Sequence, residues 1–99
     1  MTKFDVVSIG GDLFVIVQAE HLLELGSTIV VPVLPKDALP SLRGLTVDIQ
    51  IDTAVYRIRA HMPVTVESAR LRRAPVVHRL SSDEGQQVMD GLYRILSGL

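Results

Sequence analysis

One stretch of this chain, residues 81–99, has the apolar spacing of an amphipathic helix, so the rest of the chain must supply a surface that this helix covers. Two apolar stripes run side by side along it, formed by Val88, Leu92, Ile95 and Leu99 and by Met89, Tyr93 and Leu96. Ser81 followed by Glu84 fits a capping box at a helix start, and Gly98 is a residue type that closes helices. The sequence therefore predicts a C-terminal helix with an exposed tip at 97–99.

Two glycines, Gly85 and Gly91, lie inside the predicted helix, where each costs about 1 kcal/mol relative to alanine. Such glycines indicate that another backbone approaches the helix closely. For Gly91 two explanations stay open, since the helix either lies tightly on its own sheet or packs against a second subunit. A small domain this rich in aliphatic side chains cannot cover all of them, so we expect a homodimer with Met89, Gly91, Tyr93 and Leu96 at its interface.

The preceding residues form short runs rich in β-branched side chains. Residues 13–17 are apolar at nearly every position, which predicts a central strand covered on both faces. Residues 45–51 and 56–62 alternate apolar and polar side chains, which predicts a hairpin with one wet face and with acidic and basic side chains next to each other. Pro32 interrupts the run 27–34, and its missing N–H predicts a sheet edge or a bulge.

Short strands followed by one helix predict a mainly β fold, a small antiparallel barrel or sandwich covered by the C-terminal helix, as one domain over residues 1–99. No apolar run approaches the roughly 18 residues of a membrane span and no signal segment opens the chain, so we expect a cytoplasmic protein without a membrane partner. Without cysteine there is neither a disulfide nor a Cys-based zinc site. His21, His61 and His78 share no metal-ligand spacing, so we expect no metal and no cofactor.

The basic residues are unevenly placed along the chain. The formal net charge is only −1, which gives no reason to expect nucleic-acid binding. A dense basic group nevertheless lies within 70–79, namely Arg70, Arg72, Arg73 and Arg79. This stretch is either a solvated loop or the contact for an acidic partner. Since no aromatic residue lies among the arginines to stack on a base, an acidic peptide is a better candidate for that partner than a nucleic acid.

One set of residues on the predicted hairpin meets the minimum requirement of ribonuclease chemistry. His61 would transfer a proton, Arg59 would hold a phosphate, and Asp48 on the facing strand would supply a carboxylate. Alternating polar residues on a wet sheet face produce such sets by default, so the pattern by itself does not predict an enzyme.

Several motifs spread over the whole chain resemble the CcdB family of plasmid-maintenance toxins. They are Leu13-Phe14-Val15 followed by Val17-Gln18, the run 29–34 (IVVPVL), Pro63-Val64, Leu80-Ser81 and the terminal Gly98-Leu99. The resemblance implies an SH3-like antiparallel β-barrel with a small accessory sheet, a C-terminal helix and a homodimer. It also implies a toxin that is neutralised by the disordered tail of an antitoxin and that traps DNA gyrase, through the gyrase A subunit, on cleaved DNA without catalysis and without direct nucleic-acid contact of its own.

The resemblance also suggests site residues. In this family the last three residues, Trp-Gly-Ile, meet gyrase, and they correspond here to Ser97, Gly98 and Leu99. Ser97 replaces the tryptophan, which predicts weak gyrase binding because a hydroxyl offers neither the area nor the stacking face of an indole. For the antitoxin we expect contacts from Arg70 and Arg72.

Two alternative functions remain. Related toxins of the MazF and Kid type share the fold and cleave mRNA, so an endoribonuclease is the enzyme-class alternative. Against it, residues 8–12 lack the Arg-Pro and Gln-Ser pieces associated with the early loop of those enzymes. The third interpretation is a toxin-fold relative that has lost activity and only binds a partner.

Overall fold

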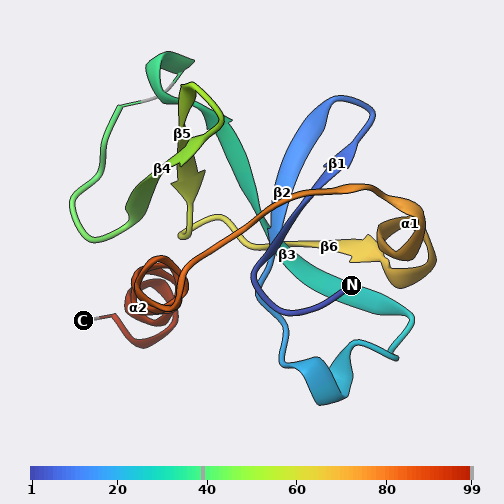
Figure 1. Ribbon diagram of the computed structural model, residues 1–99. Helices are drawn as coiled ribbons and strands as arrows, with labels where there is room; N and C mark the ends of the chain where they lie inside the picture. Colours follow the sequence, from blue (N-terminus) through green and yellow to red (C-terminus); the bar gives the residue numbers. More distant parts are fainter. Residues whose placement is uncertain (39, 99) are drawn as a thin grey trace.

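The computed structural model describes residues 1–38 and 40–98. Strands dominate this part of the chain, and the long helix comes last, as the sequence predicts (Figure 1). In chain order the elements are β1 (Asp5–Ile9), β2 (Asp12–Ile16), η1 (Glu20–Leu22), β3 (Ser27–Pro35), η2 (Lys36–Ala38), β4 (Thr46–Ile51), β5 (Ala54–Arg59), β6 (Val64–Glu67), α1 (Ser68–Arg73), β7 (Val76–Arg79) and α2 (Ser82–Ser97).

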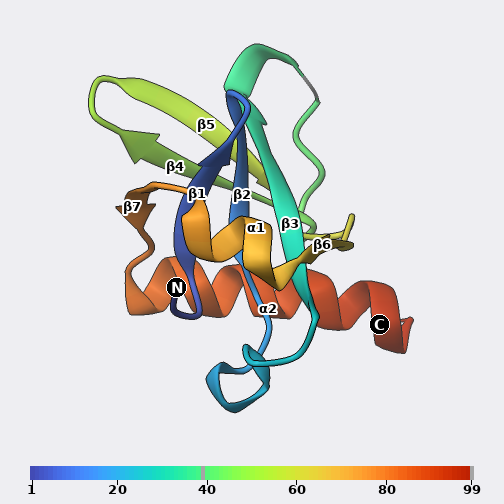
Figure 2. The same cartoon turned by 90° about the vertical axis from the view of Figure 1, so that its right-hand side faces the viewer.

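The strands form one curled antiparallel sheet (Figures 1 and 2). Its order is β4-β5-β3-β2-β1-β7, and β6 pairs with β3 beside that path. The long strand β3 makes this possible because it pairs with β6 near its start and with β5 near its end. The predicted mainly β, antiparallel fold with a C-terminal helix is confirmed.

The central strands are covered on both faces, as predicted for residues 13–17. Successive side chains of a strand point to opposite faces, so each strand contributes to two apolar clusters. The first cluster lies under α2 and includes Val6, Val15, Val31, Val33, Val88 and Leu92. The second lies under α1 and contains Val7, Ile16, Leu23, Val30 and Leu71. The middle of the sheet is therefore a layer between α2 and α1.

Pro32 lies in the interior strand β3 and not at an edge of the sheet. Its neighbour on one side is Phe14 of β2. On the other side, β6 pairs with β3 as far as Val30 and β5 pairs from Val33 onward. The proline thus falls between two partner strands, where a missing N–H removes no ladder hydrogen bond.

Helix α2 begins and ends where the sequence predicts. The Ser81 side chain accepts a hydrogen bond from the Glu84 N–H, the Glu84 carboxylate accepts one from the Ser81 N–H, and Gly98 closes the helix in the left-handed conformation at φ 75°. Figure 2 shows the helix running across one end of the strands. Neither α2 nor any other helix of residues 1–38 and 40–98 is long and apolar enough to cross a membrane.

Gly91 is buried against its own chain. A Cβ atom on this residue would lie 2.9 Å from Ala60 Cβ, 3.2 Å from the Gly44 carbonyl oxygen and 3.5 Å from Leu45 Cα. The tight packing of α2 on its own sheet therefore accounts for this glycine. Gly85, in the same helix, is also packed closely against its own chain, because a Cβ on this residue would lie 2.7 Å from the ring of Phe4.

We expect Gly91→Ala to lower the free energy of unfolding by about 1–3 kcal/mol, since the added methyl group overpacks α2 against Ala60, just after β5, and against the loop before β4. Gly26→Ala is the matched control, because a Cβ there meets no atom within 4 Å. Urea denaturation of both variants measures the difference, and equal midpoints would contradict the close packing.

Residues 68–73 form the helix α1, so the interpretation of this stretch as a loop is wrong. Leu71 is buried in the second cluster, and Ser68 is buried beside Thr28, with 2.7 Å between their hydroxyl oxygens. Three side chains also hold the loop 19–26 in place. Gln18 Nε2, just after β2, donates to Leu22 O, while from α1 Ser68 Oγ donates to Leu25 O and Arg72 Nη2 donates to Leu23 O. These contacts explain a helix that periodicity alone does not reveal.

Candidate functional site

The polar face of the β4–β5 hairpin carries an ion pair set by strand register. Asp48 lies opposite Arg57, and Arg57 Nε and Nη2 lie 2.8 and 3.1 Å from the two carboxylate oxygens. Arg57 is almost fully buried and also donates to the carbonyl of Lys36 at 3.2 Å. The hydrogen bond from Arg57 lowers the pKa of Asp48, and the same bond raises the pKa of Arg57. Acidic and basic side chains thus lie next to each other on this face, as predicted.

This pairing changes the ribonuclease set considered from the sequence. Asp48 is engaged by Arg57 and is not paired with His61, so it is not the carboxylate of an acid–base pair with that histidine. Arg59 lies opposite Thr46, and the pair Val47–Ile58 separates these two residues from Asp48 and Arg57. His61 follows β5, and its Nδ1 lies 3.3 Å from the carbonyl oxygen of Leu45.

The contact of His61 with a carbonyl group has a chemical consequence. A carbonyl oxygen only accepts hydrogen bonds, so Nδ1 must carry the proton, and the free lone pair of the neutral ring is then on Nε2. An imidazole held by one nitrogen and open at the other is suited to general acid–base catalysis. Arg59, the last residue of β5, and His61, which follows it, thus lie at the same end of the hairpin.

A cavity of about 400 Å³ lies beside the buried arginine and is lined by Lys36, Asp37, Ala38, Pro40 and Arg57. Sequence reasoning missed this feature, because η2 and β5 are about twenty residues apart and meet only through the fold. Among its lining residues, Lys36 and Arg57 are basic and Asp37 is acidic.

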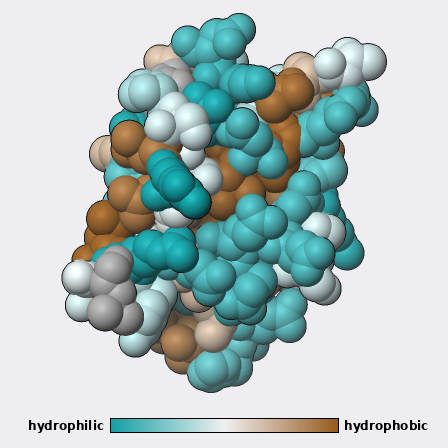
Figure 3. All heavy atoms as spheres, turned by 90° about the vertical axis from the view of Figure 1, so that its left-hand side faces the viewer, coloured by the Kyte–Doolittle hydropathy of each residue, from teal (hydrophilic) through white to brown (hydrophobic). Residues whose placement is uncertain are grey.

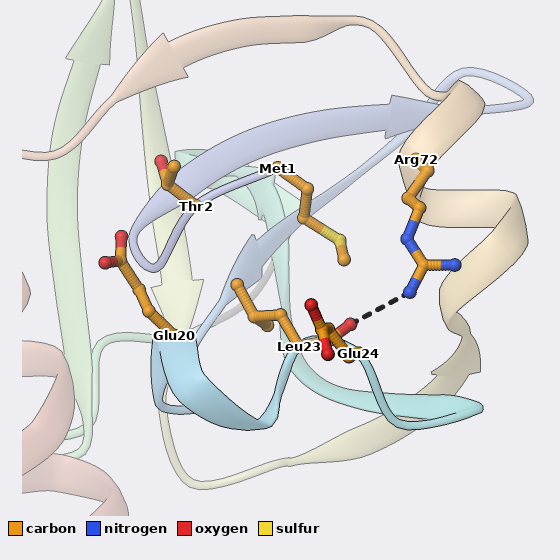
Figure 4. A pocket seen from close by; sticks show the side chains of 6 residues that line it. All are labelled: Met1, Thr2, Glu20, Leu23, Glu24 and Arg72. Carbon is orange, nitrogen blue, oxygen red and sulfur yellow. Dashed lines mark hydrogen bonds between the residues drawn. The ribbon is translucent and has the colours of Figure 1, made fainter.

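The two arginines predicted to contact an antitoxin are exposed on α1. In Figure 4 the Arg72 side chain extends from α1 toward the loop with Glu24, and its hydrogen bond to the Leu23 carbonyl measures 3.1 Å. The surrounding cavity of about 360 Å³ is lined by Met1, Thr2, Glu20, Leu23, Glu24 and Arg72. Arg72 therefore has a structural partner within the chain.

The residues predicted for a dimer interface occupy different positions on α2. Tyr93 and Leu96 are 61% and 75% exposed, Met89 is half-buried against the first cluster, and Gly91 is buried inside the chain. Figure 3 views the face that carries α2 and the β4–β5 hairpin and shows hydrophobic side chains in patches among hydrophilic ones. Of the predicted set, Tyr93 and Leu96 offer apolar surface to a partner.

The predicted gyrase contacts lie at the end of α2. Ser97 and Gly98 are exposed, and Leu99 lies outside the described residues. Within residues 1–38 and 40–98, no three His, Cys, Asp or Glu side chains are grouped so that they could hold a metal ion.

Neither a protein-family model nor a curated protein sequence matches this chain. Solved structures do. The chain matches an endoribonuclease from Mycobacterial species with a TM-score of 0.79 and 11% identity, covering 98% of this chain and 91% of that one. An endoribonuclease in complex with its cognate antitoxin from Mycobacterial species gives 0.76 and 10%, covering 98% and 95%. A MazE–MazF complex from Deinococcus radiodurans gives 0.75 and 16%, covering 98% and 96%.

These neighbours identify the fold as that of toxins from toxin–antitoxin modules. More particularly, the neighbours are toxins of the MazF type, so the likeness does not single out the CcdB family. The expectation that no catalysis is involved is contradicted, because the neighbours that share this fold over nearly the whole chain are named endoribonucleases.

Proposed function

We propose that this chain is the toxin of a toxin–antitoxin pair and that it cleaves RNA. The observation that carries the proposal is the match over nearly the whole chain to structures named endoribonucleases, one of them with its antitoxin bound. This makes the alternative of a MazF-type enzyme the better-supported function. Toxin, antitoxin and RNA would meet in the cytoplasm.

The proposed chemistry uses the end of β5. A base removes the proton from a ribose 2′-hydroxyl, the 2′-oxygen attacks the adjacent phosphorus, and the 5′-oxygen of the next nucleotide leaves with a proton. This sequence needs a proton-transfer group and a cation that stabilises the added charge on the phosphate. We assign His61 Nε2 to the proton transfer and Arg59 to the phosphate, because both extend from the same end of the hairpin.

The test is incubation of the purified chain with a mixed-sequence RNA. Products with a 2′,3′-cyclic phosphate and a 5′-hydroxyl are expected, because the proposed nucleophile is the neighbouring ribose. Intact RNA at every enzyme concentration would contradict the proposal. DNA gyrase with supercoiled plasmid is assayed in parallel.

Gyrase inhibition is the second candidate, and one observation favours it: the end of α2 leaves Ser97 and Gly98 exposed. Trapped gyrase without RNA cleavage would select this function. If the wild-type chain does not trap gyrase and the Ser97→Trp variant does, gyrase binding is assigned to the end of α2.

The antitoxin partner belongs to the same proposal. We infer that it is acidic and contacts the exposed arginines of α1, including Arg70 and Arg72. A disordered antitoxin segment pays an ordering cost of a few kcal/mol on binding, which charge complementarity and apolar contacts must offset.

We also propose a homodimer in which Tyr93 and Leu96 are buried. Leu96→Asp should raise the dimer dissociation constant by about tenfold or more, because it places a carboxylate in an apolar contact. Leu42→Asp is the control, since Leu42 is 39% exposed but lies outside α2. Sedimentation velocity of wild type and both variants measures the effect. A wild-type chain that sediments only as a monomer would exclude the dimer.

A further inference from the structure

The segment 68–80 contains four arginines and no acidic residue, in a chain whose formal net charge is −1. The structure divides these arginines into two pairs. Arg72 donates to the Leu23 carbonyl, and Arg79 Nε lies 3.0 Å from Oδ1 of the buried Asp5. This second contact is an ion pair whose geometry does not make a hydrogen bond. Both side chains therefore have roles inside the chain.

Arg70 and Arg73 differ from this first pair. Both are exposed, and among the described residues neither has a hydrogen-bond or ion-pair partner. Each guanidinium presents several N–H donors that match the geometry of a carboxylate. The two unpaired cations therefore extend from a six-residue helix that is held on the sheet by the buried Leu71.

The strand that follows offers a second kind of contact. β7 is the last strand of the sheet path and pairs with β1 alone among the described strands, so its outer edge has unpaired backbone groups. Its first two residues, Val76 and Val77, are each 44% exposed. Val76 lies opposite Val7, which belongs to the cluster under α1, so the Val76 side chain and the helix lie on the same side of the sheet. The register between β1 and β7 shifts between Val6 and Val7, so Val77 has no direct partner on β1.

We propose that the free edge of β7, together with Arg70 and Arg73, binds an extended acidic segment of a partner protein by strand addition. Main-chain hydrogen bonds to β7 would hold the segment, its apolar side chains would cover Val76 and Val77, and its carboxylates would pair with the two arginines. RNA fits this surface less well, because the stretch 68–80 has no Phe, Tyr or Trp on which a base stacks. The proposal rests on the antitoxin part of the proposed function and is independent of RNA cleavage.

The probe is a short fluorescein-labelled peptide in which Glu and Val alternate, and fluorescence anisotropy reports its binding to the full chain. The double variant Arg70→Glu/Arg73→Glu should weaken binding by about tenfold or more, with a smaller salt dependence. Arg43→Glu, an exposed arginine in another loop, is the matched control and should leave affinity within about twofold. Circular dichroism confirms that each variant is folded.

A second peptide with proline at its centre and the same charge tests strand addition, because proline lacks the N–H that a ladder needs. It should bind about tenfold more weakly or worse than the first peptide. Equal binding of the two peptides would overturn strand addition, and equal loss in the Arg43 control would show only a general charge effect. A 2′-O-methyl oligouridylate that responds to the double variant while the peptide does not would assign the surface to RNA instead. If the wild-type chain binds the peptide but does not cleave RNA, the result contradicts the proposed activity and leaves the binding proposal intact.

Discussion

Replacing His61 by alanine should lower the rate of RNA cleavage by about 100-fold or more, because general acid–base catalysis contributes roughly 10²–10⁴ to such reactions. The structural reason is that Nδ1 is held by the Leu45 carbonyl, which leaves Nε2 as the open nitrogen of the ring. The rate is measured on a fluorogenic RNA under single-turnover conditions, so that product release does not mask the chemical step.

The chain offers a matched control for this variant in His21. It is an exposed histidine in η1, on the loop before β3, and its removal should leave the rate unchanged. Unfolding curves must show that both variants are as stable as the wild type. A His61→Ala protein that cleaves at the wild-type rate would exclude this residue as the proton-transfer group and direct attention to the cavity beside Lys36.

Leu71→Ala should lower the free energy of unfolding by about 2–5 kcal/mol, since it removes most of a buried leucine and leaves a cavity in the second cluster. The effect should be concentrated on α1, because a helix of six residues is not stable in isolation and Leu71 is its buried apolar anchor. Urea denaturation measures the global loss, and hydrogen exchange locates it.

Leu22→Ala is the matched control, because this leucine is 40% exposed and its truncation should change stability by less than about 0.5 kcal/mol. If Leu71→Ala were as stable as Leu22→Ala, α1 would not depend on its insertion into the sheet. The rigid presentation of Arg70 and Arg73 would then lose its basis.

Local sequence signals predicted the local features of the fold. The capping box at Ser81 and the left-handed Gly98 follow from residue types a few positions apart, and both are in place. The apolar run of β2 correctly indicated a strand covered on both faces. The alternation of residues 45–51 and 56–62 correctly indicated acidic and basic side chains next to each other, although it did not specify that Asp48 pairs with Arg57.

Features that depend on distant contacts could not be predicted in the same way. Helix α1 has one buried apolar side chain, Leu71, so its sequence shows no helical periodicity, and it is stabilised by the burial of Leu71 and by hydrogen bonds to the loop 19–26. Gly91 was compatible with two packings until its neighbours Ala60 and Gly44 were known. The expectation of no catalysis came from a resemblance in sequence, whereas the solved structures that share the fold and overturn it are only 10–16% identical to this chain.

The pairing of β1 with β7 has a consequence for synthesis on the ribosome. β1 emerges first, yet one of its two neighbours, β7, is completed only at Arg79, and the ring of Phe4 packs on Gly85 of α2. In a nascent chain β1 therefore lacks one of its two partner strands until most of the protein has left the exit tunnel. Folding dominated by such distant pairings takes roughly milliseconds to seconds. A cell that makes this protein thus has an interval between translation and a folded product in which another newly made polypeptide can bind it first.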